Sequence, residues 1–283
     1  MINPVCYVRG KFISVDEASV SVNDLGVQRG YGIFDFLRVS GNVPLFIEDH
    51  LDRFFHSAKE MRLSVQESRQ EISEIIFHLI KQNNLPSSGI RILLTGGESP
   101  DGYKIILPGL VIVQQAITPP PDEMKIQGIR LLSYPFQRQL SHVKTTDYLM
   151  AIWLQHWLKN GGGDDLLYHQ AGMITECPRS NLFMVTQDGK LVTPGTNILK
   201  GITRKQVIRL AIESGLKVEE RDIHISELRE ATEAFITSST KRIIPVSQLD
   251  DFVFPAYSLN SVSGRLWQSF LAYEGSIVMN HSF

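Results

Sequence analysis

The sequence contains little cysteine, no large excess of charge and no long hydrophobic segment. Its two cysteines, Cys6 and Cys177, lie far apart and match no metal-ligand spacing, so we expect neither a disulfide framework nor a metal site. The formal net charge is only −2 and the basic residues are scattered, which argues against nucleic-acid or anionic-membrane partners. No uncharged apolar segment approaches the roughly 20 residues that cross a bilayer, and the N-terminus shows no signal-peptide pattern. These absences predict a cytoplasmic, soluble, mixed α and β protein.

The domain organisation is indicated by length and by one proline-rich segment. A chain of 283 residues can form one large or two modest domains. Thr118 is followed by three consecutive prolines, which favour an extended chain and cannot continue a strand ladder. We therefore predict an N-terminal domain over residues 1–117, a linker over 118–124 and a C-terminal domain over 125–283.

Both halves show an α+β order of segments. In the first half, strands and turns are predicted up to residue 45, helices over 50–63 and along the apolar stripe of 72–80, and strands over 90–97 and 104–117. In the second half, we predict a strand at 128–136, a helix at 146–160, hairpins at 166–175 and 182–193, helices at 204–215 and 226–231, and strands at 233–237 and 242–246. Gly161–Gly163 would end the helix at 146–160, and Thr203 is the expected N-cap of the helix at 204–215.

Two side chains could carry proton chemistry. Lys144 lies in LSHVKTTDYL, where a strand-like segment gives way to a helix; it is either a solvated surface lysine or a buried amine with a lowered pKa, able to attack a carbonyl. Glu176 lies in ITECPRSNLF, between two apolar segments. It is either an exposed hairpin residue or a carboxylate that controls the protonation of a cofactor ring nitrogen.

Three further segments have the composition of phosphate sites. Gly201, Ile202 and Thr203 precede a helix, whose free N–H groups attract anions, although ordinary helix starts look the same. The turn Ser238-Ser239-Thr240 is rich in hydroxyl groups, but such turns are frequent without a ligand. Arg53 is a cation on an otherwise apolar helix face, where a surface salt bridge is the alternative.

In combination and order, these segments resemble the fold-type IV, pyridoxal-phosphate-dependent enzymes. This family includes branched-chain aminotransferase, D-amino-acid aminotransferase and aminodeoxychorismate lyase. The resemblance covers roughly residues 3–250, and the combination of segments is specific. It rests on the segments RGYGIFDFLRV, HLDRFFHSAKEMR, HVKTTDYL, ITECPRSNLFMV, ILKGITRKQVIRLA and VEERDIHISELREATEAFITSSTKRIIPV.

The resemblance implies a role for each candidate. Lys144 would be the Schiff-base lysine and Glu176 would pair with the ring nitrogen of pyridoxal 5′-phosphate. The phosphate would be held by a set drawn from three segments, namely Arg53, Gly201, Ile202, Thr203, Ser239 and Thr240. Tyr148 is the candidate for the ring hydroxyl, although branched-chain enzymes place their Tyr one residue further from the lysine. The fold implied is a two-domain α+β protein like D-amino-acid aminotransferase, with the cofactor in the inter-domain cleft.

The substrate positions depart from the relatives. Gly96-Gly97 stands where D-amino-acid aminotransferases carry an Arg that binds the substrate carboxylate, and Asp35-Phe36 replaces the Glu-Gly of branched-chain enzymes. Lys241-Arg242 follows the second phosphate turn, either to recognise a carboxylate or to face solvent. The candidate substrate residues are Tyr31, Phe36, Arg38 and Lys241.

The predicted function is therefore transfer of an amino group between an amino acid and a 2-oxo acid. The donor is expected to be an L-amino acid of branched-chain character, processed through a Lys144 Schiff base. The alternatives are an aminodeoxychorismate-type lyase, a D-amino-acid aminotransferase and a non-catalytic member that binds the cofactor. Relatives are homodimers, so we expect a homodimer, with no nucleic-acid or membrane partner.

Overall fold

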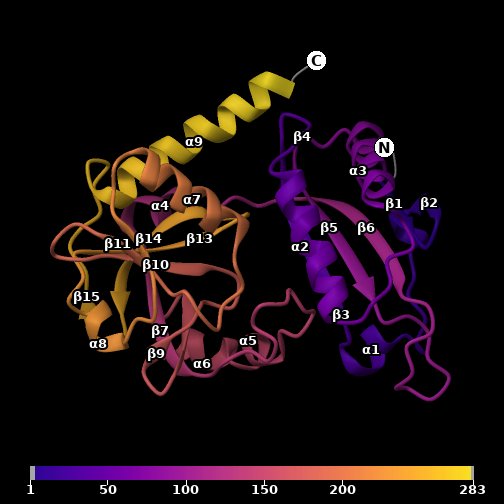
Figure 1. The fold of residues 1–283 in the computed structure, drawn as a ribbon, viewed down its shortest axis with the longest axis horizontal. Helices are drawn as coiled ribbons and strands as arrows, with labels where there is room; N and C mark the ends of the chain where they lie inside the picture. Colours follow the sequence, from indigo (N-terminus) through magenta and orange to yellow (C-terminus); the bar gives the residue numbers. More distant parts are fainter. Residues whose placement is uncertain (1–3, 282–283) are drawn as a thin grey trace. The chain divides into compact units, whose positions relative to one another are not determined.

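The computed structural model describes residues 4–281, which form two compact units (Figure 1). Within the described residues, the first unit contains residues 4–118, the segment Val143–Asp147 and residues 276–281. The second contains Pro119–His142 and Tyr148–Gly275. Each unit has its own sheet and helices, so the predicted α+β class is confirmed, whereas the predicted domain limits of 117 and 125 stay a prediction.

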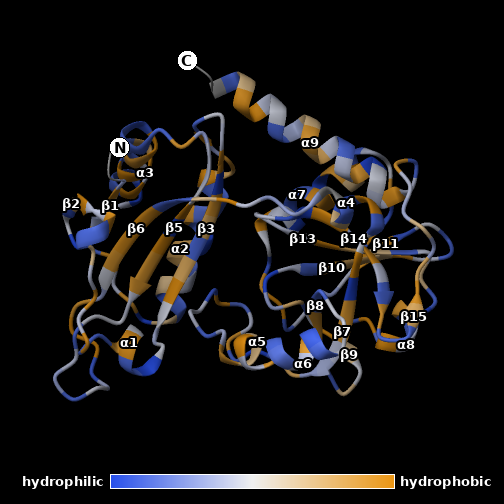
Figure 2. Cartoon of the chain, turned by 180° about the vertical axis from the view of Figure 1, so that it is seen from behind, coloured by the Kyte–Doolittle hydropathy of each residue, from blue (hydrophilic) through white to orange (hydrophobic). Residues whose placement is uncertain are grey.

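The first unit is built on an antiparallel sheet with the strand order β2-β1-β6-β5-β3-β4. Figure 2 shows that β5 and β6 consist largely of hydrophobic residues. Its elements are β1 (Val5–Val8), β2 (Lys11–Ser14), η1 (Val15–Glu17), α1 (Leu25–Arg29), β3 (Gly32–Ser40), β4 (Val43–Pro44), α2 (Ile47–Glu60), α3 (Arg69–Asn83), β5 (Ser87–Thr95) and β6 (Gly109–Ala116).

The core of this unit forms where α2 and α3 pack on the sheet. In α2, Leu51 and Phe54 are fully buried, and the predicted stripe of α3 is buried over Ile72–Ile80. Burying such side chains contributes roughly 1.5–3 kcal/mol each, which fixes both helices on one face of the sheet. The start of α3 is held by a capping box, in which Ser68 and Glu71 each accept the other's backbone N–H.

The second unit contains a mixed sheet with the order β12-β11-β10-β13-β14-β7-β8-β9, and β15 pairs with β14. The pairs β11/β12, β14/β7 and β7/β8 are parallel. Its elements are α4 (Asp122–Gln127), β7 (Ile129–Pro135), α5 (Leu149–Trp153), α6 (Gln155–Asn160), β8 (Asp165–Gln170), β9 (Met173–Ile174), β10 (Asn181–Val185), β11 (Leu191–Thr193), α7 (Ile202–Glu213), β12 (Val218–Glu220), α8 (Ile225–Leu228), β13 (Glu233–Ser238), β14 (Arg242–Leu249) and β15 (Phe252–Val253), followed by α9 (Val262–His281), which belongs to this unit up to Gly275.

Several predicted boundaries were wrong. The single helix expected over 146–160 is two short helices that meet at Leu154, and the strand expected from residue 104 begins only at Gly109, after Pro108. Thr203 is not the N-cap of α7: Gly201 holds that position, so Thr203 is the second helical residue. The 20-residue helix α9 was not predicted at all.

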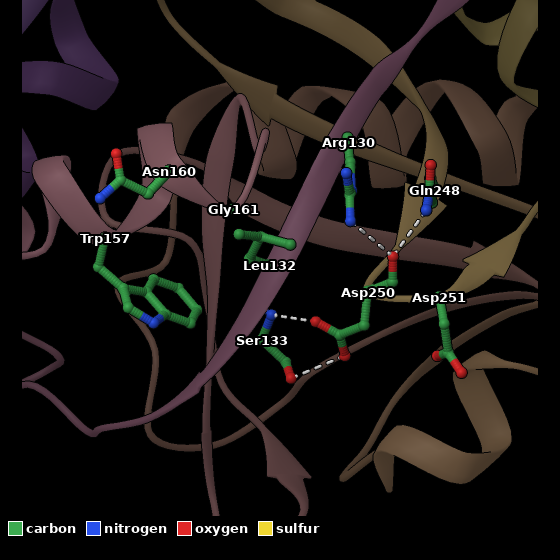
Figure 3. A pocket seen from close by; sticks show the side chains of 9 residues that line it. All are labelled: Arg130, Leu132, Ser133, Trp157, Asn160, Gly161, Gln248, Asp250 and Asp251. Carbon is green, nitrogen blue, oxygen red and sulfur yellow. Dashed lines mark hydrogen bonds between the residues drawn. The ribbon is translucent and has the colours of Figure 1, made fainter.

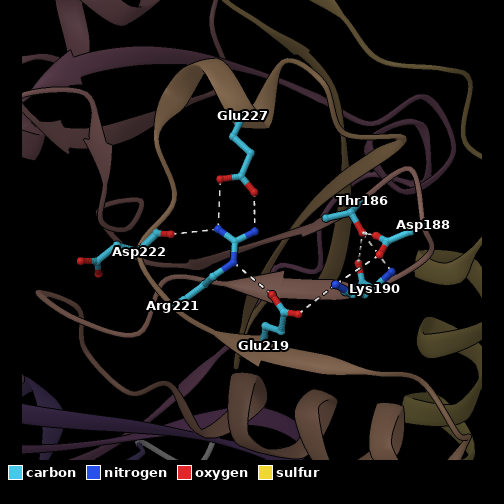
Figure 4. Close-up of polar contacts among 7 residues, drawn as sticks. All are labelled: Thr186, Asp188, Lys190, Glu219, Arg221, Asp222 and Glu227. Atoms are coloured by element: carbon cyan, nitrogen blue, oxygen red, sulfur yellow. Dashed lines mark hydrogen bonds and ion pairs between the residues drawn. The ribbon is translucent and has the colours of Figure 1, made fainter.

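A surface network of charges joins three elements of the second unit (Figure 4). The Nζ atom of Lys190 lies 3.2 Å from Asp188 and 3.3 Å from Glu219. Glu219 also accepts a hydrogen bond from Arg221, which pairs with Glu227 of α8 through both terminal nitrogens. These contacts link the β10–β11 hairpin, β12 and α8 at the solvent-exposed surface.

No helix among residues 4–281 is long and apolar enough to cross a membrane. Within the same residues, no group of three or more His, Cys, Asp or Glu side chains is arranged to hold a metal ion. Cys6 and Cys177 are both buried as free thiols, and burial raises the pKa of each of them.

Candidate active site

Lys144 is held against β3 and α2 of the first unit by its backbone. Its carbonyl accepts the N–H of Phe34 at 3.0 Å, and its own N–H donates to the Ser57 hydroxyl at 3.3 Å. The half-buried side chain places Nζ 4.6 Å from the centre of the Phe34 ring. The predicted catalytic amine is therefore fixed beside an aromatic ring on one face of the sheet.

That face of the sheet carries the aromatic and basic side chains of β3. Phe34, Phe36 and Arg38 alternate with buried residues and are each half-buried. Arg91 of β5 lies directly opposite Phe36, with its guanidinium carbon 5.1 Å from the Phe34 ring centre and 5.8 Å from that of Phe36. Arg91 was missed by the sequence analysis because only the cross-strand register brings it to these rings.

The opposite face of β3 contains a buried charged cluster. Asp35, which is completely inaccessible to solvent, accepts hydrogen bonds from Nε and Nη2 of Arg53, both at 2.8 Å. The His50 Nδ1 lies 2.6 Å from the same carboxylate. Arg53, the predicted phosphate ligand, is thus bound by Asp35 through two parallel hydrogen bonds. Its Nη1 makes no hydrogen bond within residues 4–281.

The protonation of this cluster follows from burial and charge. Burial alone would raise the pKa of Asp35, but attraction and hydrogen bonds from Arg53 and His50 outweigh it, so the pKa falls below its ordinary value. For His50, burial lowers the pKa and outweighs the opposing effect of Asp35. The His50 ring is consequently neutral at neutral pH, and its Nδ1–H donates to an ionised Asp35 rather than forming a full ion pair.

Two other predicted substrate residues also lie in the first unit. Tyr31 is half-buried, and its hydroxyl donates to the carbonyl of Met61 at 2.7 Å. Arg38 lies opposite Gly89 on β5. A side chain at Gly89 would collide with Phe36, because its Cβ would lie 2.1 Å from the tip of that ring. The absence of a side chain at Gly89 therefore leaves room for the Phe36 ring.

Glu176 is a buried carboxylate with two donors in the second unit. Its Oε1 accepts from Nε of Arg138 at 2.9 Å, and its Oε2 accepts from the backbone N–H of Leu199 at 3.0 Å. The residue is only 5% exposed, which excludes the exposed-hairpin alternative. Arg138, which also donates to the carbonyl of Ser141, follows β7 in a loop and carried no signal in the sequence.

A close-packed cradle lies next to Glu176 at the start of α7. Asn181 donates to the carbonyl of Leu199 at 2.8 Å, and a Cβ at Gly201 would lie only 2.2 Å from its Oδ1. Ile202 and Thr203 are buried, and no hydrogen bond caps their backbone N–H groups within the described chain. Such uncapped N–H groups at a helix start favour an anion.

The hydroxyl-rich turn lies beside this cradle because Asn181 of β10 pairs with Thr237 of β13. Ser238 Oγ accepts the N–H of Lys241 at 3.2 Å, which tightens the turn through Ser239 and Thr240. The hydroxyl oxygens of Ser180 and Thr237 are buried, with no hydrogen-bond partner within residues 4–281. Two unpartnered hydroxyls beside a tight glycine are features of a ligand site rather than of a closed core.

Tyr148 and Lys241 complete the predicted set. Tyr148 is half-buried at the residue before α5, and its carbonyl accepts the N–H of Ile152. The Nζ atom of Lys241 lies 2.5 Å from Oδ2 of Asp165, and Nε of Arg242 lies 2.6 Å from Oε2 of Glu274. Both cations that follow the turn are therefore paired with carboxylates of the same chain.

A comparison with protein families decides which enzymes the chain is related to. The family model "Amino-transferase class IV" matches residues 32–249, which is most of the chain. The chain belongs to the class IV aminotransferases. The predicted family, the transaminase activity and the cofactor that this family uses, pyridoxal 5′-phosphate, are thereby confirmed.

Relatives of known name agree with this class IV assignment. The chain is 30% identical over 272 residues to the "Putative branched-chain-amino-acid aminotransferase" of Methanocaldococcus jannaschii, covering 93% of this chain and 94% of the relative. It is 25% identical over 283 residues to the D-alanine aminotransferase of Staphylococcus epidermidis, covering 98% of both. The solved branched-chain amino acid aminotransferase of Escherichia coli superimposes with a TM-score of 0.89 at 26% identity, over 96% of this chain and 94% of that one.

Proposed function

We propose that this class IV aminotransferase moves the amino group of an L-amino acid with an apolar, branched side chain to a 2-oxo acid. The observation that carries the substrate class is the surface beside Lys144. Phe34 and Phe36 offer apolar rings to a donor side chain, and Arg91 offers a guanidinium that can pair with a carboxylate of a donor or acceptor. Gly96-Gly97 supplies no cation in the turn after β5, which favours L- over D-amino acids.

The residues of the second unit fit pyridoxal 5′-phosphate. The uncapped N–H groups of Ile202 and Thr203 and the hydroxyls of Ser239 and Thr240 would hold the phosphate, and Gly201 leaves room for it. Arg53, oriented by Asp35, would add a cation to the phosphate, and Tyr148 would contact the ring hydroxyl. When bound, the cofactor supplies an electron-withdrawing ring that stabilises negative charge at the substrate Cα.

The charged side chains then have separate tasks. Glu176 would hold a proton on the ring nitrogen, because Arg138 and the Leu199 N–H fix the orientation of its carboxylate. Lys144 would take the proton from the substrate Cα on its Nζ and return it during the second half of the transfer. Arg38 would line the face that carries Phe34 and Phe36, Tyr31 would act from the side packed on α2, and Lys241 would act indirectly through Asp165.

We further propose a cytoplasmic homodimer. Leu149, Ile152 and Trp153 lie three and four residues apart on α5, and their side chains are 72%, 65% and 67% exposed. A helix that is apolar on its outer as well as its inner side favours a covered surface. Two free buried thiols suit a reducing compartment. Light scattering at several protein concentrations tests the dimer, and a monomer at all of them would contradict it.

The function is tested with purified holoenzyme, 2-oxoglutarate and a panel of L- and D-amino acids, by measuring glutamate formation. We expect L-leucine, L-isoleucine and L-valine to be the best donors. Lys144→Ala should abolish transfer, Glu176→Gln should retain the cofactor but lose most turnover, and the exposed control Lys159→Met should behave as wild type. Absence of transfer from every L-amino acid would contradict the proposal, and pyruvate release without an acceptor would favour the lyase alternative.

A further inference from the structure

The two basic residues that follow the hydroxyl-rich turn both pair with buried carboxylates of the second unit. Nζ of Lys241 lies 2.5 Å from Oδ2 of Asp165, the first residue of β8. Nε of Arg242 lies 2.6 Å from Oε2 of Glu274 on α9. Asp165 is 6% exposed and Glu274 is 5% exposed. Burying a carboxylate is costly unless a cation compensates its charge, so the two pairs tie the turn to β8 and to α9.

Arg242 has a backbone conformation that residues with a side chain seldom adopt. Its φ is +59°, in the left-handed region. Arg242 pairs with Ser238 across the hairpin loop of residues 239–241. Hairpins of this length often contain one left-handed residue, which is usually glycine, because a Cβ makes the conformation strained. The loop therefore keeps its shape only if other contacts hold Arg242 in this conformation.

The opposite end of β14 shows how the fold holds such a residue. Asp250, the residue after the strand, also has a positive φ, of +52°. Its carboxylate accepts the N–H and the hydroxyl of Ser133 on β7, both at 2.8 Å, in the wall of an open surface hollow (Figure 3). A side-chain contact thus fixes the left-handed residue at each end of the strand, and at the end next to the loop that contact comes from Glu274.

Glu274 occupies a core position of α9. The side chains that this helix buries within the described chain lie three or four residues apart on one stripe, namely Ser263, Leu266, Phe270 and Glu274. An apolar residue would ordinarily occupy the last of these positions. A carboxylate there weakens the packing of the helix unless a cation meets it, and Arg242 is that cation.

The helix α9 matches the hairpin of β13 and β14 in length. At its start, the carboxylate of Glu233, the first residue of β13, accepts the N–H of Val262 at 2.8 Å. From Val262 to Glu274 the helix advances by about 18 Å, at ~1.5 Å per residue. From Glu233 to Ser238, where the loop begins, β13 advances by about 17 Å, at ~3.3 Å per residue. A helix fixed at Glu233 therefore brings Glu274 level with the loop.

The same part of α9 contacts the other element that is proposed to hold the phosphate. The guanidinium carbon of Arg209 on α7 lies 4.1 Å from the centre of the Tyr273 ring. Tyr273 precedes Glu274 in the sequence, and α7 begins with Ile202 and Thr203, whose N–H groups are uncapped. One segment of α9 is thus attached both to the hydroxyl-rich loop and to the helix that forms the phosphate cradle.

We propose that Glu274 is a positioning residue for the cofactor phosphate. Through Arg242 it holds the loop that carries Ser239 and Thr240 in the shape that binds the phosphate, an inference that rests on the proposed placement of the phosphate at these hydroxyls. Without the ion pair, only a fraction of the molecules has the loop in this shape. The apparent affinity for the phosphate group then falls in proportion to that fraction.

The test compares two ligands of the full-length protein after the cofactor has been removed by dialysis. They are pyridoxal 5′-phosphate and pyridoxal, which lacks only the phosphate. Both are titrated by the absorbance of the bound ring, and the ratio of the two dissociation constants measures the contribution of the phosphate. Glu274→Gln should weaken binding of pyridoxal 5′-phosphate about tenfold, as expected for one charge-assisted contact, and leave binding of pyridoxal unchanged. The ³¹P resonance of the bound phosphate should also shift.

Two substitutions of Arg242 test whether Glu274 acts through the backbone of the loop. Arg242→Ala removes the ion pair and keeps a Cβ in the left-handed region, so it should lose as much affinity as Glu274→Gln. Arg242→Gly removes the same pair, but glycine adopts this conformation readily and should recover most of the lost affinity. Equal losses in the two Arg242 variants, or a loss in Glu274→Gln that extends to pyridoxal, would overturn the proposal. If Glu274→Gln does not fold, the two Arg242 variants decide the question.

Three controls separate this role from a general loss of stability and from the phosphate placement itself. Ser133→Ala removes the corresponding contact at the opposite end of β14, and Glu48→Gln breaks an exposed pair with Arg69 that has the same 2.6 Å separation. Both should keep the wild-type ratio, and a changed ratio in Ser133→Ala would overturn the proposal. An unchanged ratio in Thr240→Val would contradict the phosphate placement. A changed ratio in Thr240→Val together with a wild-type ratio in Glu274→Gln would contradict only the role of Glu274.

Discussion

Replacing Asp35 by Asn removes the negative charge at the centre of the buried cluster of the first unit. The carboxylate accepts two hydrogen bonds from Arg53 at 2.8 Å and one from His50 at 2.6 Å, with no exposure to solvent. Removing one partner of a buried ion pair costs about 3–5 kcal/mol, because the other charge stays buried without compensation. Since folded domains are stable by only about 5–15 kcal/mol, we expect a large loss of stability in this variant.

The assay is urea unfolding of the Asp35→Asn variant, followed by circular dichroism at neutral pH. The matched control is Asp16→Asn, the same change at an exposed position of η1, which should unfold as wild type. A loss below ~1 kcal/mol for Asp35→Asn would refute the reasoning, because that is the range of solvent-exposed pairs. Such a result would mean that the charge of Asp35 is screened despite its burial.

The pH dependence gives a second check on Asp35. Its pKa is lower in the folded than in the unfolded chain, so its ionisation stabilises the fold above the unfolded value of about 3.9. That contribution is lost as the pH falls through the folded pKa. The stability difference between wild type and Asp35→Asn should therefore be constant from neutral pH down to about pH 4–5 and shrink only under more acidic conditions. A difference that shrinks already between pH 7 and 6 would contradict the assignment.

Three further changes have definite expected outcomes. Arg138→Met removes the hydrogen bond that Nε of Arg138 donates to Glu176. Loss of a charge-assisted bond of about 1.5–3 kcal/mol should weaken cofactor retention at least about tenfold, measured by absorbance during dialysis, and unchanged retention would contradict this. Gly89→Ala forces the Phe36 ring to move and should lower the free energy of unfolding by about 1–3 kcal/mol. The moved ring should also change the order of donor preference, measured as KM for each donor. KM values for all donors equal to those of wild type would contradict this. Arg221→Met removes the centre of the exposed network in Figure 4 and should barely change the urea midpoint of unfolding. Any residual difference from wild type should vanish in about 1 M salt. A large loss of stability that does not depend on salt would contradict this expectation.

Local patterns in the sequence predicted much of the fold. The apolar stripe of α3 lies within one helix, so the local sequence contains the information that places it. The same holds for the hairpin predicted over 182–193, which β10 and β11 form. The single helix expected over 146–160 was wrong because apolar residues on every side satisfy helical spacing equally well whether or not the chain bends at Leu154.

The candidate site was predicted unevenly for a similar reason. Lys144, Glu176 and the start of α7 lie in segments whose sequences are specific to the family, so the family resemblance identified them as candidates. Arg138 and Arg91 are ordinary basic residues in their own segments, and nothing nearby in the sequence distinguishes them. Only the fold shows their contacts. Arg138 bonds to Glu176, which lies 38 positions away in the sequence, and Arg91 contacts Phe34 on the facing strand.

By itself, the sequence determined the α+β class, the amphipathic helices and the family, and it named the side chains proposed to carry the proton chemistry, because these depend on periodicity and on short motifs. Only the tertiary structure decided the environment of each charge. Folding buries Asp35 against Arg53, gives Glu176 the donors Arg138 and Leu199 N–H, and pairs Lys241 with Asp165. The energy of a charge depends on which groups surround it at a few ångströms, and chain folding brings those groups together from distant positions.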